Sequence, residues 1–372
     1  MTSSNRSNDK EIAQRKAEVD NYVSSLRGVL SMKSLIDKKN GDFYFGGSLH
    51  YAEKEGKAQT PDIVVGIGGE YLIGEVKKSL RNPSTFEKSE EYLKYVDEEI
   101  MEQIRKYDNK FKEIDKDSHD LFLLVPYRNN EAVGRIRYDY LEPHESSLEK
   151  VFRNNFGLIT FSIESGANTQ FIIVKLETGF VSNKELYDAL KLGWNKSLGE
   201  LKGDLGRYKI YQESDKTPVE YVMILLWTEV FPEIINKNSI EKILEWQDDE
   251  GHIFEVTHET LLSYLHEFYT CPSFGCNPKK QFNSKLVGRA MHLFSTISVK
   301  NSKTKSMEPI VEVLNDDKKT KYRVKYRRFR SGDELDHILK ALCSKPAKKL
   351  NGAKKKEFKQ GTLEDAGVLM TR

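Results

Sequence analysis

Residues 61–77 read PDIVVGIGGEYLIGEVK, an apolar stretch with charged residues near both ends. Two short apolar runs flank Gly68-Gly69, a dipeptide that can adopt the positive φ angles of a tight hairpin turn. The stretch therefore predicts a buried β-hairpin. Charges in a sheet core are unfavourable unless they are paired or bind a metal. Asp62, Glu75 and Lys77 are thus the residues of this hairpin that need a physical explanation.

These three charged residues are predicted to converge at one end of the hairpin. Glu75 and Lys77 lie two residues apart, so they share one face of their strand. Counting back from the glycine turn places Asp62 opposite residues 75–76, within reach across the strands. Carboxylate oxygens suit Mg²⁺ or Mn²⁺. A nearby lysine can orient or deprotonate an attacking water, or stabilise developing negative charge.

The arrangement resembles the PD-(D/E)xK nuclease superfamily. Pro61-Asp62, a gap of twelve residues and then Glu75-Val76-Lys77 match its motif. The resemblance implies that Asp62 and Glu75 bind the metal, that the carbonyl of Val76 completes the shell and that Lys77 serves the attacking water.

Two further features of the sequence extend the resemblance. Residues 103–107, QIRKY, look like the QxxxY element of the RecB-type subgroup. Gln103 and Tyr107 lie one helical turn apart on one face, as needed if both point at the site. The family often adds an upstream acidic residue, for which both Glu53 and Glu18 are candidates.

A mixed α/β sheet flanked by helices is predicted around the hairpin. The resemblance covers about residues 9–176 and implies a restriction-endonuclease-like fold. Apolar periodicity predicts helices at 9–36, 85–114 and 145–154, and strands at 43–51, 121–127, 157–163 and 170–176.

The C-terminal part of the chain predicts a mainly α-helical, winged-helix-like domain that binds DNA. Helices are predicted at 219–231, 239–246, 260–269 and 279–296, followed by a basic ribbon in which KYRVKYRR (321–328) alternates basic and apolar residues. Four cations on one strand face, without acidic partners, repel one another unless an anion lies over them. In a winged helix the recognition helix enters the major groove and the wing contacts phosphate. The candidate DNA-binding residues are Lys285, Arg289 and His292 on the helix and Lys321, Arg323, Lys325 and Arg327 on the ribbon.

The predicted domain limits are 1–196 for the nuclease-like domain, 197–218 for a linker, 219–332 for the winged-helix-like domain and 333–372 for a helix with a disordered basic tail. The lysine-rich tail would add salt-sensitive attraction to nucleic acid. The 372-residue chain has three cysteines, which fits a reducing compartment and not a disulfide scaffold. No apolar run approaches the about 20 residues of a membrane span.

The sequence thus predicts a Mg²⁺- or Mn²⁺-dependent endonuclease that acts on DNA, expected to be double-stranded, without an organic cofactor or a membrane. A homodimer is one way to cut both strands. The expected location is the cytoplasm at the nucleoid, or the nucleus of a eukaryote. Two alternatives stay open: a non-catalytic DNA-binding or regulatory protein on the same scaffold, and an RNase.

Overall fold

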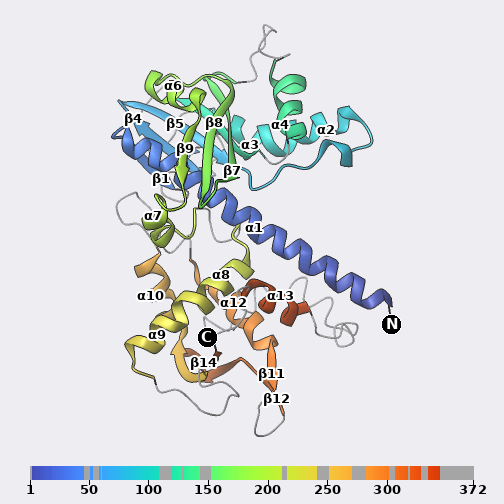
Figure 1. Cartoon of the computed structure of the whole chain (residues 1–372), viewed down its shortest axis with the longest axis vertical. Helices are drawn as coiled ribbons and strands as arrows, with labels where there is room; N and C mark the ends of the chain where they lie inside the picture. Colours follow the sequence, from blue (N-terminus) through green and yellow to red (C-terminus); the bar gives the residue numbers. More distant parts are fainter. Residues whose placement is uncertain are drawn as a thin grey trace. The chain divides into compact units, whose positions relative to one another are not determined.

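The computed structural model describes residues 2–45, 51–52, 58–59, 61–108, 119–127, 130–142, 152–211, 216–240, 251–269, 282–300, 306–316, 319–327 and 334–343. The chain divides into two compact units (Figure 1). The sheet unit comprises Asn21–Glu213 and Tyr269–Asn277; the second unit comprises Met1–Asp20, Ser214–Phe268 and Pro278–Arg372. This division differs from the predicted domain limits, because helix α1 (Thr2–Lys38) contributes to both units. The predicted basic tail, from residue 344 onward, lies outside the described residues.

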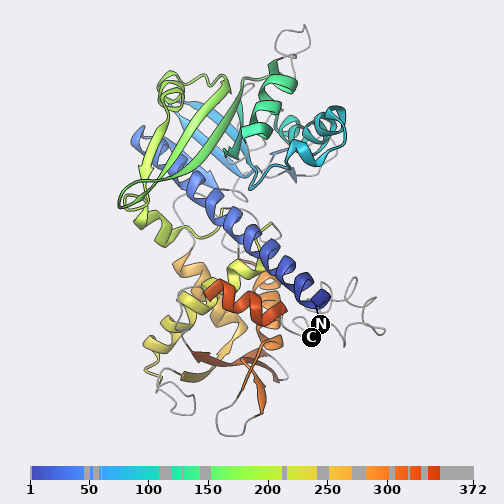
Figure 2. The same cartoon turned by 45° about the vertical axis from the view of Figure 1, so that its right-hand side comes forward.

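A curled seven-stranded sheet forms the centre of the sheet unit and confirms the predicted mixed α/β class (Figure 2). In spatial order the sheet contains β1 (Asp42–Phe45), β4 (Ile63–Ile67), β5 (Glu70–Val76), β6 (Asp120–Pro126), β7 (Phe156–Ser165), β8 (Gln170–Gly179) and β9 (Trp194–Ser197). Strands β5–β6 and β6–β7 pair in parallel, and the other neighbours pair antiparallel. A separate short pair joins β2 (Tyr51–Ala52) to β3 (Ala58–Gln59).

The predicted hairpin is confirmed as β4–β5. Its turn residues Gly68 and Gly69 have φ angles of 59° and 84°, the left-handed values that glycine adopts without strain. A third glycine, Gly74, allows close packing, because a Cβ atom there would lie 2.0 Å from the Phe122 ring on β6. The turn therefore sets the register of the hairpin, and Gly74 seats β5 against its neighbour directly before Glu75.

Helices pack on both faces of this sheet. A continuous helix, formed by α2 (Ser89–Tyr95), the π-helical turn η2 (Val96–Met101) and α3 (Glu102–Tyr107), follows β5 after a short 3₁₀ turn, η1 (Pro83–Thr85). With α4 (Asn130–Arg135) and its π-helical extension η3 (Ile136–Leu141) it shares an apolar core with the strand residues Val64, Ile73 and Leu123. The first two figures show these helices gathered at one side of the sheet.

The other face of the sheet packs against α1. A Cβ atom on Gly28 of α1 would lie 2.6 Å from the ring of Phe161. Phe161 lies three residues after Leu158, which belongs to the core under α2–α4, so the two side chains occupy opposite faces of β7. The sheet is therefore covered on both sides, as its nearly continuous apolar strands require.

Of the helix predicted at 145–154, residues 145–151 lie outside the described residues, and the described residues 152–154 are not helical. The described helical segment formed by α4 and η3 was not predicted. One predicted segment of the sheet unit differs from the structure. The segment predicted as a linker, 197–218, completes β9, forms α7 (Lys202–Arg207) and buries Tyr208 and Tyr211. Tyr208 stacks on Phe45 with ring centroids 5.4 Å apart, so this segment is part of the core. Helix α6 (Lys184–Leu192) precedes it.

The second unit combines helices with a three-stranded antiparallel sheet of order β10-β14-β13 and a two-stranded ribbon, β11–β12. Its core includes the aromatic residues Trp227, Phe231, Phe294 and Tyr326. Strand β10 was not predicted, and residues 241–246 of the helix predicted at 239–246 lie outside the described residues. Its described elements are α8 (Val219–Leu225), η4 (Leu226–Val230), α9 (Phe231–Lys237), β10 (Gly251–Thr257), α10 (His258–Phe268), α12 (Ser284–Thr296), β11 (Ser298–Lys300), β12 (Met307–Pro309), β13 (Val311–Asp316), β14 (Lys319–Arg327) and α13 (Glu334–Cys343).

Among the helices that the structure describes in either unit, none combines the length and the apolar character that crossing a membrane requires.

Candidate active site

The structure brings the carboxylates of Asp62 and Glu75 to the same end and the same face of the β4–β5 hairpin. The last paired residues at this end are Ile63 and Gly74, so one further step places Asp62 opposite Glu75. Asp62 Oδ2 accepts a hydrogen bond from Val76 N at 2.9 Å, which ties its side chain to the partner strand. The two residues are only 3% and 2% exposed. Two acidic side chains are therefore buried next to each other.

Four side chains form a closed ring of hydrogen bonds around Glu75. Lys77 Nζ donates to Glu75 Oε1 (3.3 Å) and to Gln103 Oε1 (2.8 Å). Gln103 Nε2 donates to Tyr107 OH (3.3 Å), and Tyr107 OH donates to Glu75 Oε2 (2.9 Å). The ring joins β5 to α3 and holds both oxygens of Glu75. It contains four of the five predicted catalytic residues.

Burial decides the protonation of the phenol in this ring. Burial raises the pKa of Tyr107, and the nearby carboxylates of Glu75 and Asp62 raise that pKa further. The phenol therefore stays protonated and donates to Glu75. Lys77 Nζ lies 3.3 Å from Glu75 Oε1, and this ion pair lies beside the second buried carboxylate, Asp62, in a poorly solvated place.

Tyr211 is a member of this environment that the sequence reasoning missed. Its hydroxyl lies 2.5 Å from Ser25 Oγ, and its ring stacks on Tyr22 at 5.3 Å, so helix α1 holds it. Burial raises the pKa of Tyr211 well above its usual value, and the charges of Asp62 and Glu75 contribute to the rise. The signal in the sequence is the aromatic and apolar content of YKIY (208–211), inside the segment that was predicted to be a linker.

The oxygens of this site fit a hard divalent cation. Mg²⁺ is commonly held by one or two carboxylates together with phosphate oxygens of a substrate, and Asp62 and Glu75 supply such a pair. The carbonyl of Val76 is the third predicted ligand. Within the described residues no group of three or more acidic, histidine or cysteine side chains lies close enough to bind a metal on its own.

The additional acidic residue is not identified by the structure. Glu53 lies outside the described residues. Glu18 is exposed on the part of α1 that belongs to the second unit. There it lines a hollow of about 410 Å³ with Arg15 and Arg289. The choice between Glu53 and Glu18 thus stays a prediction.

The basic residues predicted on a helix of the second unit lie on α12. The Asn283 side chain caps this helix by accepting from Leu286 N at 2.9 Å, and Leu286 and Phe294 are buried, as predicted. Lys285, Arg289 and His292 are exposed. Over the ranges for which side chains are described, none of these three makes an ion pair.

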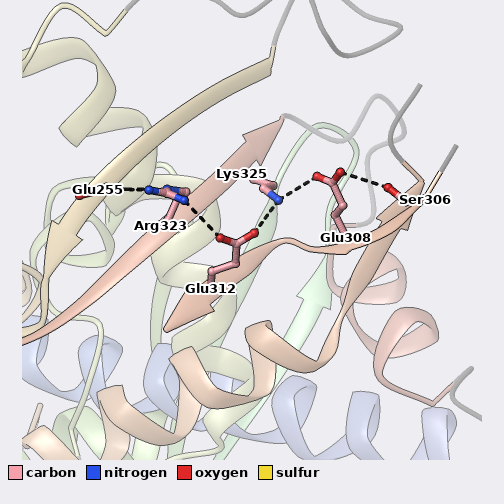
Figure 3. Close-up of polar contacts among 6 residues, drawn as sticks. All are labelled: Glu255, Ser306, Glu308, Glu312, Arg323 and Lys325. Atoms are coloured by element: carbon pink, nitrogen blue, oxygen red, sulfur yellow. Dashed lines mark hydrogen bonds and ion pairs between the residues drawn. The ribbon is translucent and has the colours of Figure 1, made fainter. Parts of the chain in front are cut away.

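Two of the four cations predicted on the basic face of β14 pair with carboxylates, contrary to the prediction. Arg323 pairs with Glu255 on β10 (2.8 Å) and Glu312 on β13 (3.5 Å). Lys325, whose side chain is 9% exposed, pairs with Glu312 (2.7 Å) and with Glu308 on β12 (2.9 Å), as Figure 3 shows. We call this set the ionic ladder: Glu255, Arg323, Glu312, Lys325 and Glu308. The prediction that these cations lack acidic partners is wrong for Arg323 and Lys325, because neighbouring strands supply carboxylates to both.

The two remaining residues of that prediction lie at the ends of the same strand. Lys321 pairs through its backbone with Thr257 on β10 and Leu314 on β13. For Arg327 the structure describes only the backbone, which pairs with Gly251.

A search of protein-family models, of curated proteins and of solved structures finds no match to this chain. The interpretation of the site therefore depends on the geometry of its own residues.

Proposed function

We propose that the sheet unit is a divalent-metal-dependent nuclease that hydrolyses phosphodiester bonds of DNA. The observation that supports this most is the buried pair Asp62 and Glu75 beside Lys77. Two carboxylates that are buried side by side at one end of a hairpin supply oxygen ligands of the kind that a divalent cation binds. The combination of these three side chains with Gln103 and Tyr107 also fits the resemblance to PD-(D/E)xK nucleases of the RecB type.

Each side chain of the ring has a distinct role in this proposal. Asp62 and Glu75 hold the cation, and the hydrogen bonds from Val76 N and Tyr107 OH fix their orientation. Lys77, held between Glu75 and Gln103, orients the attacking water and stabilises negative charge that develops on the phosphate. When bound, Mg²⁺ or Mn²⁺ would supply Lewis-acid polarisation of the phosphate and activation of water.

The second unit, in this proposal, positions the DNA duplex in the manner of a winged helix. Exposed Lys285, Arg289 and His292 on α12 are suited to phosphate and base contacts. The ladder residues of β14 are left out of this surface, because carboxylates already balance their charge.

One observation favours the alternative of a non-catalytic scaffold. Both oxygens of Glu75 already accept hydrogen bonds from Lys77 and Tyr107, an arrangement that a purely structural ion pair would also show. Such a protein would bind DNA tightly and cleave nothing.

Plasmid nicking separates the two functions. Supercoiled DNA is incubated with Mg²⁺ or Mn²⁺ and with the wild type, Glu75→Gln, Lys77→Met or the control Lys184→Met, whose lysine is 86% exposed on α6. The nuclease proposal expects nicking by the wild type and the control and a loss of about 10²-fold or more in the two site variants. Equal nicking by all four proteins would reject this site. Tight DNA binding without cleavage of DNA or RNA under any metal would favour the scaffold.

A further inference from the structure

A series of contacts leads from the buried carboxylates to the surface. The chain from Glu75 to Arg81 runs antiparallel to the helix formed by α2, η2 and α3. Glu75 contacts Tyr107, Lys77 contacts Gln103, and Arg81 contacts Glu99. The contacts themselves place Tyr107, Gln103 and Glu99 on the side of the helix that faces the chain from Glu75 to Arg81. Arg81 therefore continues the row that begins at the candidate active site.

The side chains along this row become progressively more exposed. Glu75 is 2% exposed, the Lys77 side chain 20% and the Arg81 side chain 58%. Tyr95, against which Arg81 stacks, precedes Gln103 by eight positions, about two helical turns or on the order of 10 Å along the axis. Arg81 thus lies on the solvent-accessible side of the site, at a distance of a few nucleotides in a DNA strand that advances about 3.4 Å per nucleotide.

Arg81 is held in place by an aromatic ring. Its guanidinium lies over the Tyr95 ring at 4.9 Å, and its backbone N donates to Tyr95 OH at 3.4 Å. Phe86 packs against both Tyr95 and Tyr92, with ring centroids 5.5 Å and 5.3 Å apart, so the platform under Arg81 is itself supported. An arginine ordered in this way loses less conformational entropy when it binds a ligand.

We propose that Arg81 binds a backbone phosphate of the cleaved DNA strand that flanks the scissile phosphate, and that Tyr95 positions it. This inference rests on the proposed nuclease function. A guanidinium binds phosphate through two parallel N–H donors, and stacking on an aromatic ring leaves its edge open for them. The pair with Glu99 is long, at 3.4 Å, and both side chains are more than half exposed, so a phosphate can displace this carboxylate at little cost.

Arg137 offers a matched control. It also stacks on a tyrosine, Tyr138, at 4.7 Å, and pairs with a carboxylate, Glu142, at 3.0 Å. It lies on η3, outside the row of contacts that starts at Glu75. The two arginines therefore share their local chemistry and differ in their relation to the site.

The test measures DNA affinity and cleavage for the full-length wild type, Arg81→Ala, Glu99→Gln and Arg137→Ala. Affinity for a short labelled duplex is measured in EDTA at several salt concentrations, and steady-state cleavage is measured with Mg²⁺. Arg81→Ala is expected to weaken binding about tenfold and to lower the slope of log affinity against log salt by about one. It should raise KM and leave kcat nearly unchanged, because the contact is made equally before and during the reaction.

The other variants extend the test. Glu99→Gln removes the competing carboxylate and should tighten binding about two- to threefold. Arg137→Ala should match the wild type in affinity, salt slope and KM. Circular dichroism checks that each variant is folded.

The failure of this inference can be told from failure of the proposed function. If wild-type cleavage depends on Glu75 but Arg81→Ala keeps the wild-type affinity and salt slope, or changes no more than Arg137→Ala, the assignment of Arg81 is wrong and the nuclease function stands. If the wild type neither binds nor cleaves DNA, both are wrong.

Discussion

The end of the β4–β5 hairpin and the ionic ladder carry the same kinds of charged side chains in different surroundings. At the hairpin, Asp62 and Glu75 face Lys77. In the ladder, three carboxylates (Glu255, Glu308 and Glu312) face the two cations Arg323 and Lys325. Each cluster therefore combines carboxylates with basic side chains. The kinds of charge do not distinguish them.

Burial does distinguish the two clusters. Asp62 and Glu75 are 3% and 2% exposed, whereas the carboxylate side chains of the ladder are 29–49% exposed. Water screens the charges of the ladder, so its ion pairs contribute modestly to stability. The hairpin carboxylates have little water around them, and in the proposed function a divalent cation stabilises them. Burial of the charged groups therefore separates the proposed metal site from the ladder.

The largest expected effect comes from removing the buried charge. Asp62→Asn and Glu75→Gln should each lower the rate of DNA nicking by about 10²- to 10⁴-fold. In metal-free buffer the free energy of unfolding of Asp62→Asn should equal or exceed that of the wild type. The amide oxygen of the asparagine can still accept a hydrogen bond from Val76 N, and a buried charge is removed. Urea unfolding and plasmid nicking measure the two quantities.

The ladder supplies the control for this prediction. Glu312→Gln should leave nicking unchanged and lower the free energy of unfolding by about 1 kcal/mol or less. If Asp62→Asn instead destabilises the protein by several kcal/mol and Glu312→Gln does not, the hairpin carboxylate has a structural role and the comparison fails.

Tyr107→Phe should have the next largest effect. It removes the donor to Glu75 Oε2 and the acceptor of Gln103 Nε2, so kcat should fall about 10- to 100-fold while KM stays unchanged. The matched variant is Tyr322→Phe on β14, whose buried hydroxyl bonds His258 Nδ1 at 3.0 Å. Both variants should cost about 1 kcal/mol of stability, and only Tyr107→Phe should slow cleavage. If Tyr107→Phe and Tyr322→Phe cleaved DNA at the same rate, the ring of hydrogen bonds around Glu75 would have no catalytic importance.

The sequence predicts the hairpin end well because its contacts are local. A two-glycine turn fixes which residues of the two strands face each other, so the proximity of Asp62 and Glu75 follows from counting. Gln103 was found through the family resemblance, and the structure places its side chain on Lys77. The second half of the segment 197–218 was wrongly predicted to be a linker, because Tyr211 contacts residues of α1 that are distant in the sequence. One of them, Ser25, lies 186 residues away.

The ladder could not be predicted from the alternation in β14. That pattern correctly indicates one polar and one apolar face, and Tyr322, Val324 and Tyr326 are buried. It contains no information on which strands lie beside β14. Glu255 is 68 residues away from Arg323 and lies on a strand that was not predicted.

A smaller effect is expected from Lys325→Met. The Lys325 side chain is 9% exposed and holds Glu308 and Glu312 together, so its loss should lower the free energy of unfolding by about 1–3 kcal/mol. Arg323→Met, at an exposed position, should cost about 1 kcal/mol or less. Neither should change the salt dependence of DNA binding, whereas Lys285→Ala on α12 should lower that slope by about one. If Lys325→Met alone lowered the slope of log affinity against log salt, β14 would belong to the DNA-binding surface.

The smallest expected effect is the pH dependence of stability that a buried histidine causes in each of the two units. Burial lowers the pKa of His119, beside the Tyr107 carbonyl, and of His258, beside Tyr322. Between the lowered folded pKa and the ordinary unfolded value near 6.5, the unfolded chain binds more protons, so stability rises with pH in that window and is lost on acidification. His258→Gln should reduce the loss of stability between pH 7 and pH 5 by about 1 kcal/mol or less. Urea unfolding at both pH values measures it, and an unchanged pH dependence would contradict the prediction.

Binding of Mn²⁺ in the absence of DNA, followed by electron paramagnetic resonance, tests the hairpin site most directly. The wild type and Glu312→Gln should bind the ion alike, and Glu75→Gln should lose at least about tenfold in affinity. Equal Mn²⁺ affinity in the wild type and Glu75→Gln would contradict the assignment of Asp62 and Glu75 as a metal site.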